Sequence, residues 1–447
     1  MRMLRSVLGL ALVLAATQAT AQLCPGDCDG DRTVSVSDLV VGVNWALGSG
    51  SYCIAADGNA DGQVAVNELI TGVTNALQGC APAAPVTNAA VIGRYAALLY
   101  ANYNAALDGA TALNTAIDDF LAAPSDAGLQ HAKQSWRDSR PQYMESEPGR
   151  FYDGPIDNAQ SGPEGLINSW PLDESFIDYV VGDPTAGIIN APDLYPDLTA
   201  AVLSQLNAAE SETAISTGYH AIEFLLWGQD LSATGPGNRP YTDYVTDGSG
   251  TASNQARRGE YLRVVAQLLV DNLTAVRDQW VPDVEGNYRA AFVKLESAEA
   301  LRRMLTGMGT LSGGELTGER LSVAFETKDQ EDEHSCFSDN TLDDLSHDTL
   351  GIQNAFFGRY GGVMGLGVYD LVKAVNPDLA AHTRQAMEAA QSAMHAIPPP
   401  FDQAILGPDT APGRVAIAAA IADLNSQTDA IADSAAALGI SISTTSP

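Results

Sequence analysis

The chain has 447 residues, enough for two or three domains, and apolar residues make up 45% of it, so sizeable hydrophobic cores can form. Its 55 Asp and Glu residues against 23 Lys and Arg residues give a formal net charge of −32, which disfavours binding to nucleic acid or to anionic membrane surfaces. The acidic excess is expected either to serve solubility alone or to include carboxylates that bind cations.

Residues 1–21 are typical of a signal peptide. A basic start precedes an apolar run, and Ala19-Thr20-Ala21 fits an A-x-A cleavage site, so the mature chain is expected to begin at Gln22. The apolar run is too short to cross a bilayer, and no later stretch is long and apolar enough for a membrane helix. The sequence therefore predicts an exported protein in the periplasm, on the outer membrane surface or outside the cell.

Four of the five cysteines lie close together in one short segment: Cys24, Cys28, Cys53 and Cys80. In an exported protein these four are expected to form two disulfides, and the sequence does not choose among the three pairings that four cysteines allow. Cys336 is far from the others and is expected to be a free buried thiol, with a reactive thiol as the alternative.

Residues 22–80 contain an internal repeat of an acidic loop followed by a helical stretch, DLVVGVNWALG and then NELITGVTNALQG. Each loop carries side-chain oxygens at positions 1, 3, 5 and 12, a spacing that folds hard oxygen ligands around one Ca²⁺. The alternative is a pair of acidic turns without an ion. The predicted calcium ligands are Asp27, Asp29, Asp31 and Asp38 in the first loop and Asp57, Asn59, Asp61 and Glu68 in the second.

Position 6 of such a loop, where the chain turns sharply, is Gly62 in the second copy but Arg32 in the first, so the sequence leaves the calcium affinity of the first loop open. The duplicated loop and helix resembles a dockerin-like EF-hand module. This resemblance implies calcium binding and, as in dockerins, docking to a protein partner. The four cysteines depart from the simplest dockerins.

A Pro- and Ala-rich linker is expected at residues 81–88, before a helical region over residues 89–447. The stretches YAALLYANYNAALDGATALNTAIDDFLA, YLRVVAQLLVDNLTAV and AAFVKLESAEALRRML repeat apolar residues at three- and four-residue spacing, and RVAIAAAIADLNSQTDAIADSAAAL is expected to be the last helix. Long helices with modest loops predict helical bundles. Longer irregular stretches are expected at about 147–183 and 229–254, where function often resides.

The segment GYHAIEFLLWGQD places His220 and Glu223 three residues apart, on one face of a predicted helix. An imidazole beside a carboxylate can bind zinc or iron, or act as a base with its orienting partner. A buried, hydrogen-bonded pair is the alternative. The motif lacks the second histidine of H-E-x-x-H, so further ligands would have to come from elsewhere in the chain.

This segment resembles the G-x-H-x-x-E signature of the imelysin family, with Gly218, His220 and Glu223 at the matching positions. Further blocks match in the same order, and together they cover roughly residues 86–438. The blocks are SWRDSRPQYMESEPGRFYDGPID, GPEGLINSWPLDESFIDYV, GNRPYTDY, GTLSGGELTGERLSVAFET and DQEDEHSCFSDNTLDDLSHDTLGIQNAFFGRY. Matching polar positions without an assigned role are Arg140, Glu164, Asp173, Glu331, Asp332, Glu333 and His334.

The resemblance implies an all-α protein of two helical bundles with the signature helix near their interface. It implies iron-regulated, metal-dependent binding in the cell envelope, linked to iron acquisition, with iron or zinc at His220, Glu223 and Glu147. A metallopeptidase that uses His220 and Glu223 for catalysis is the alternative, and dockerin-type scaffolding is another. The expected partners are a metal ion or a peptide, and a protein for the leading module. His220 and Glu223 are expected to line a polar cleft.

Overall fold

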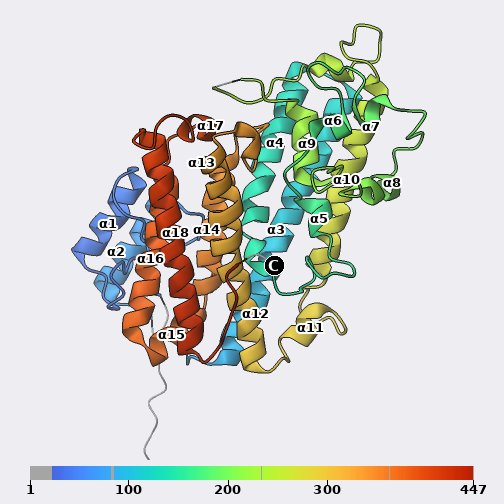
Figure 1. Cartoon of the computed structure of the whole chain (residues 1–447). Helices are drawn as coiled ribbons and strands as arrows, with labels where there is room; N and C mark the ends of the chain where they lie inside the picture. The colour runs from blue at the N-terminus through green and yellow to red at the C-terminus, as the bar shows by residue number, and fades with distance from the viewer. Residues whose placement is uncertain (1–22, 82–84, 233, 362, 446–447) are drawn as a thin grey trace, which may run out of the picture.

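The computed structural model describes residues 23–81, 85–232, 234–361 and 363–445. The expected signal peptide, residues 1–21, lies outside the described residues, as does the middle of the expected linker. Two helical bundles lie side by side, and a small disulfide-linked segment lies at the edge of the second bundle (Figure 1). The prediction of an all-α fold is confirmed, since the helices carry the architecture and β-structure is limited to one short hairpin among the described residues.

The leading segment, Cys24–Cys80, contains the two repeated helices α1 (Val36–Ala46) and α2 (Val66–Gln78). The repeat is visible in the packing as well as in the sequence, because equivalent positions of the two helices have the same pattern of burial. The helices contact each other, with Gly42 beside Leu69 and Gly72 beside Leu39. The segment is not isolated, because Tyr52 and Ile54 belong to the main hydrophobic core.

The first bundle consists of α3 (Asn88–Ala122), α4 (Asp126–Met144), α9 (Gly218–Trp227) and α10 (Gln255–Asp278). The second consists of α12 (Ser297–Thr310), α14 (Thr341–Phe357), α16 (Pro377–Ala396) and α18 (Pro412–Ala437). Helices α4 and α14 pack against each other and join the bundles. Apolar residues at helical spacing, buried on one face, explain the long helices that the sequence predicts.

Helix α12 continues directly into a π-helix of 12 residues, η3 (Leu311–Ser322). Its side chains follow the five-residue register: the Thr317 hydroxyl donates to the Ser312 carbonyl at 2.8 Å and the Ser322 hydroxyl to the Thr317 carbonyl at 2.5 Å. Longer π-helices are rare, and π-turns occur frequently at functional sites. This element faces η1 (Glu147–Gly149) and α14, where the bundles meet.

The helix expected over residues 290–305 is interrupted, which corrects the sequence prediction. It forms α11 (Tyr288–Phe292) and α12, and the turn between them lets both Phe292 and Ala300 reach the core. The other short helices are α5 (Glu164–Ile167), α6 (Glu174–Ile177), α7 (Gly187–Asn190), α8 (Ala200–Leu206), η2 (Tyr241–Tyr244), α13 (Val323–Thr327), η4 (Gln330–Asp332), α15 (Val368–Val375) and α17 (Phe401–Ala404). Strands β1 (Arg359–Tyr360) and β2 (Val363–Met364) form the hairpin.

None of the helices in the described residues combines the length and the apolar character needed to cross a membrane.

Candidate functional site

The signature helix α9 is buried along its whole length, so its sequence does not show a polar face. It begins at Gly218, whose φ of +87° is in the left-handed region. A Cβ atom at this position would lie 2.5 Å from the carbonyl oxygen of Ile167. The glycine of the signature is therefore required by backbone conformation and close packing, and these place His220 and Glu223 at the contact between the bundles.

His220 and Glu223 contact each other as their spacing predicts, with 3.0 Å between Nδ1 of the histidine and Oε2 of the glutamate. The other glutamate oxygen, Oε1, accepts hydrogen bonds from the backbone nitrogen of Ser338 at 2.9 Å and from its hydroxyl at 2.6 Å. The two side chains are only 1% and 0% exposed. The polar cleft that they were expected to line is not accessible to solvent, because Ser338 and the segment before α14 cover both side chains.

The environment favours the neutral form of both groups. Burial, together with the nearby guanidinium of Arg140, holds the pKa of His220 well below its usual value. Burial raises the pKa of Glu223 to about 8, although the hydrogen bonds from Ser338 act in the opposite direction. The buried Nε2 atom of His220 has no hydrogen-bond partner among the described residues. A neutral imidazole with one unpaired nitrogen is a potential metal ligand.

A second histidine lies beside the first. The rings of His220 and His334 are edge to face, with their centroids 4.8 Å apart. Nδ1 of His334 lies 2.9 Å from Oδ2 of Asp344 on α14, and Arg140 donates to both oxygens of the same aspartate at 2.7 and 3.1 Å. Burial opposes ionisation of Asp344, but Arg140 and His334 outweigh it and hold its pKa well below the usual value. Burial lowers the pKa of His334 to about 3.

Glu147, expected as a third metal ligand, is instead the centre of an ion-pair cluster. Its Oε1 accepts from Arg150 at 2.9 Å and from Asn168 at 3.1 Å, and its Oε2 accepts from Arg320 at 2.8 Å. Asn168 also accepts from Arg140 at 2.6 Å, so the two polar clusters form one network. Because guanidinium and amide groups already occupy both oxygens, Glu147 is poorly placed to bind a metal as well.

Acidic groups outnumber cations in this network. The π-helix places Arg320 where it binds Glu147, Glu315 and Asp348, the last two from η3 and α14. The carboxyl groups are Glu147, Glu164, Glu223, Glu315, Asp344 and Asp348, and the guanidiniums are Arg140, Arg150 and Arg320. Burial raises the pKa of Glu164, Glu223 and Asp348 and so opposes their ionisation, which a bound cation would favour.

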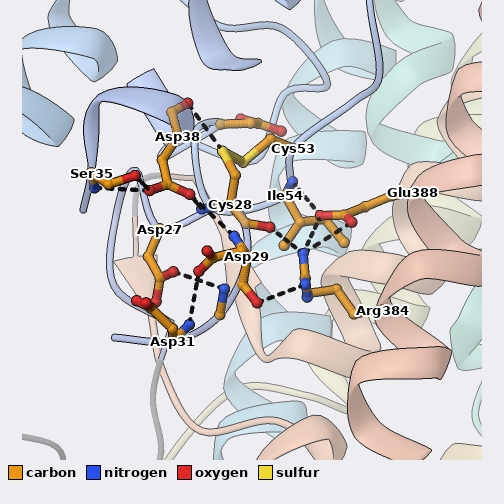
Figure 2. Close-up of a disulfide and its surroundings, with 12 residues drawn as sticks. Asp27, Cys28, Asp29, Asp31, Ser35, Asp38, Cys53, Ile54, Arg384 and Glu388 are labelled. Carbon is orange, nitrogen blue, oxygen red and sulfur yellow. Dashed lines mark hydrogen bonds and ion pairs between the residues drawn. A yellow bond between two sulfur atoms is a disulfide. The ribbon is translucent and has the colours of Figure 1, made fainter. Parts of the chain in front are cut away.

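The described residues bring three potential metal-ligand side chains together at the first acidic loop, and not at His220, Glu223 and Glu147. The ligand atoms of Asp27, Asp29 and Asp38 lie within 4.8 Å of one another. Figure 2 shows them around a tight loop in which Asp27 accepts from the backbone nitrogen of Arg32 at 2.8 Å. Asp31 lies in the same loop but outside this group.

The two loops turn in the same way despite their different residues at position 6. Arg32 has a φ of +71° and Gly62 a φ of +81°, so the arginine adopts the conformation that the sequence alone assigned to glycine. The loops differ at position 1 instead. The carboxylate of Asp57 accepts from the Tyr52 hydroxyl at 2.5 Å and lies 3.5 Å from a guanidinium nitrogen of Arg359. This positive charge opposes cation binding in the second loop.

Both loops contact the second bundle. Arg384 of α16 donates to the carbonyl of Cys28 and, at 3.0 Å, to that of Asp29, and it also pairs with Glu388 (Figure 2). In the second loop, Asn354 of α14 donates to the carbonyl of Ala60 at 3.1 Å. The leading segment is therefore hydrogen-bonded to α16 and to α14, and α14 also carries part of the polar network.

The clustered cysteines form two disulfides, Cys24–Cys80 and Cys28–Cys53. The first joins the two ends of the leading segment, and the second joins the start of the first loop to the start of the second. Cys336 is free and buried, and burial holds the pKa of its thiol well above the usual value.

Sequence reasoning missed several partners of the signature. Asp344, Asp348, Arg320 and Ser338 all lie in blocks that carry the imelysin resemblance. Asp344 pairs with α4, Asp348 with Arg320, Arg320 with η1 and Ser338 with α9, and these pairings depend on how distant segments pack. The only sequence signal was the concentration of acidic and basic residues in those blocks.

Residues 99–431 match a family model described as imelysin. Iron-regulated protein A of Synechococcus elongatus is 24% identical over 356 residues, which cover 77% of this chain and 85% of that protein. A putative iron-regulated protein A precursor from Parabacteroides distasonis has a similar fold, with a TM-score of 0.59 and 21% identity over 78% of this chain and 96% of that one. An imelysin-like protein from Psychrobacter arcticum also has a similar fold, with a TM-score of 0.54 and 13% identity over 78% of this chain and 97% of that one. Since the family match spans most of the sequence, this chain belongs to the imelysin family.

Proposed function

We propose that this chain is an exported envelope protein that binds a transition metal at the buried network between its bundles, as part of iron acquisition. The unpaired, buried Nε2 of His220 is the observation that carries the proposal. The surplus of carboxyl groups in the same network supports a bound cation, because burial opposes the ionisation of Glu223 and Asp348 and a cation would favour it. The relatives described as iron-regulated support iron over zinc.

In this proposal His220 is the metal ligand and Glu223 orients it. A metal at Nε2 requires the imidazole proton at Nδ1. The bound cation would favour the ionised form of Glu223, whose carboxylate, 3.0 Å from Nδ1, would then accept that proton. Metal-binding histidines commonly donate their other nitrogen to a carboxylate in this way. The remaining ligands would come from the metal's own partners or from carboxyl groups of the network. Glu147 is not among them, because two arginines bind it.

The site favours binding over peptide hydrolysis. A metallopeptidase needs a metal-held water and a groove in which a peptide reaches it. Here the histidine and the glutamate of the signature are buried beneath Ser338, and no set of three ligand side chains among the described residues converges on them. Both features work against an open catalytic metal.

A cleavage assay separates binding from hydrolysis. The full mature chain, supplied with ferrous iron or with zinc, is incubated with an unfolded polypeptide, and products are followed by mass spectrometry. We expect no cleavage above that of His220→Ala, and none above that of His131→Ala, a control at an exposed histidine of α4. Cleavage by the wild type that persists in His131→Ala but is lost in His220→Ala would establish the peptidase instead.

We further propose that the leading segment binds calcium, as an EF-hand-like module with the ligands predicted from the sequence. The convergence of Asp27, Asp29 and Asp38 supports the first loop. The second loop repeats the spacing, but Arg359 lies beside Asp57. We therefore expect tighter binding in the first loop, whose affinity the sequence left open because Arg32 stands at position 6.

Calcium should raise the thermal stability of the full chain. A ligand at one hundred times its dissociation constant adds about 2.7 kcal/mol per site. The double variant Asp27→Ala, Asp57→Ala should lose this gain, measured as the difference in melting temperature between excess calcium and chelator. Asp193→Ala with Asp197→Ala, which removes the same charge from an exposed loop, should keep it. Identical melting of the wild type in calcium and in chelator would refute calcium binding.

A further inference from the structure

Helix α1 leaves a row of large apolar side chains in water. Val36, Val40, Val43 and Leu47, the residue that caps the helix, are spaced four, three and four residues apart, so they form one stripe along the helix. Each has at least 39% of its surface exposed. A stripe with this spacing is the pattern that helices use to pack against other helices.

Helix α2 repeats the stripe at the equivalent positions, Val66, Ile70, Val73 and Leu77, and these side chains are between 44% and 82% exposed. The two helices lie at the edge of the molecule, beside α16 and away from the first bundle (Figure 1). Burying one such side chain removes roughly 100 Å² of apolar surface. Together the two stripes then expose on the order of 500 Å² of apolar surface.

The two helices carry no exposed charge. Their only charged residues are Asp38 and Glu68, and both are buried at the N-terminal turns. The other exposed residues of the two helices are small or uncharged: Ser37, Asn44, Ala46, Asn67, Thr71, Thr74, Ala76 and Gln78. This surface is unusual in a chain with a net charge of −32, and an uncharged, apolar centre is the composition of a protein interface.

We propose that two copies of this chain pair through the stripes of α1 and α2, so that four helices bury them against one another. A partner recognised by opposite charge would bind the acidic surface that the rest of the chain presents. A second copy has the same charge and is repelled by that surface, so it can approach closely only where neither copy is charged. The same patch on both copies is self-complementary, as a twofold interface requires.

The area is consistent with a stable pair. A standard interface buries about 800 Å² on each partner, with an apolar centre and a polar rim. The stripes supply the apolar centre, and exposed polar residues of the same helices, such as Ser37, Asn44 and Asn67, lie beside them as a rim. The proposal depends neither on the transition-metal site nor on calcium binding by the acidic loops, so it can be tested separately from both.

Analytical ultracentrifugation of the full mature chain, up to about 100 µM, tests the proposal. We expect a dimer that tightens as salt is added, because salt screens the repulsion between the acidic copies. Val40→Asp with Ile70→Asp should weaken the dimer by at least about a hundredfold, since four carboxylates would be buried without partners. Val415→Asp, at a comparably exposed valine of α18, should leave the dimer unchanged.

Val40→Ser with Ile70→Ser provides a milder pair of changes at the same positions, and circular dichroism and melting of every variant show whether the fold is intact. A monomeric wild type at all concentrations would overturn the proposal, even if a different protein binds the stripes. A dimer that survives both double variants unchanged would overturn it as well.

Discussion

Replacing Arg140 with methionine should lower the free energy of unfolding by about 3–5 kcal/mol, because it leaves Asp344 as a buried carboxylate without its main partner. Arg140 donates to both oxygens of Asp344 and to Asn168, and neither member of the ion pair is exposed. The pair joins α4 to α14 and so links the two bundles. Denaturant unfolding of the full chain, compared with the wild type, measures the loss.

An exposed arginine provides the matched control. Arg263 pairs with Asp118 at 3.0 Å, and both side chains are about half exposed. Exposed ion pairs contribute about 0–1 kcal/mol, so Arg263→Met should change stability little. Similar losses in the two variants would contradict the view that the network holds the bundles together.

Arg140→Met should also change how the stability of the chain depends on pH in acid. A carboxyl group whose pKa is lower in the folded chain binds fewer protons when folded, so its stabilisation is complete above the unfolded pKa and is lost as the pH falls through the folded one. Asp344 is such a group. Without Arg140 its pKa should rise, and its share of the stability should be lost at a higher pH than in the wild type.

Gly218→Ala adds a single methyl group to the signature and should lower the free energy of unfolding substantially. The change forces an alanine into the left-handed region, which costs roughly 1–2 kcal/mol, and places its Cβ 2.5 Å from the carbonyl oxygen of Ile167. Overpacking adds typically 1–3 kcal/mol more, so we expect a total loss of about 3 kcal/mol or greater. Unfolding of the full chain measures this loss.

Gly286→Ala is a control that separates the cost of the left-handed backbone conformation from the cost of the close contact with Ile167. Gly286 has a φ of +85°, but a Cβ at this position meets nothing within 4 Å. It should therefore show only the conformational cost, roughly 1–2 kcal/mol. Equal losses at Gly218 and Gly286 would mean that the contact with Ile167 is unimportant for the position of α9.

The long helices could be predicted because their periodic apolar residues record which face is buried. This holds for α3, α10 and α18. It holds only in part for α9, whose apolar spacing correctly predicted a helix but, since all its residues are buried, could not show which face meets the site. The break between α11 and α12 was missed because apolar spacing continues across the turn.

The site was only partly predictable for a physical reason. The contact between His220 and Glu223 could be predicted from their three-residue spacing, because both lie on one helix. The pairing of Glu147 with Arg320 depends on a π-helix, whose five-residue register is not distinguishable from ordinary helical sequence. The covering contact from Ser338 depends on a loop more than one hundred residues away.

Metal content tests the central claim most directly. The full mature chain and His220→Ala are loaded with ferrous iron in excess calcium, which occupies the acidic loops, and are then desalted and analysed for iron. The account predicts about one iron per wild-type chain, retained in His131→Ala and lost in His220→Ala, as expected for a site that depends on one imidazole ligand. Equal iron in the wild type and His220→Ala, or none in either, would contradict it.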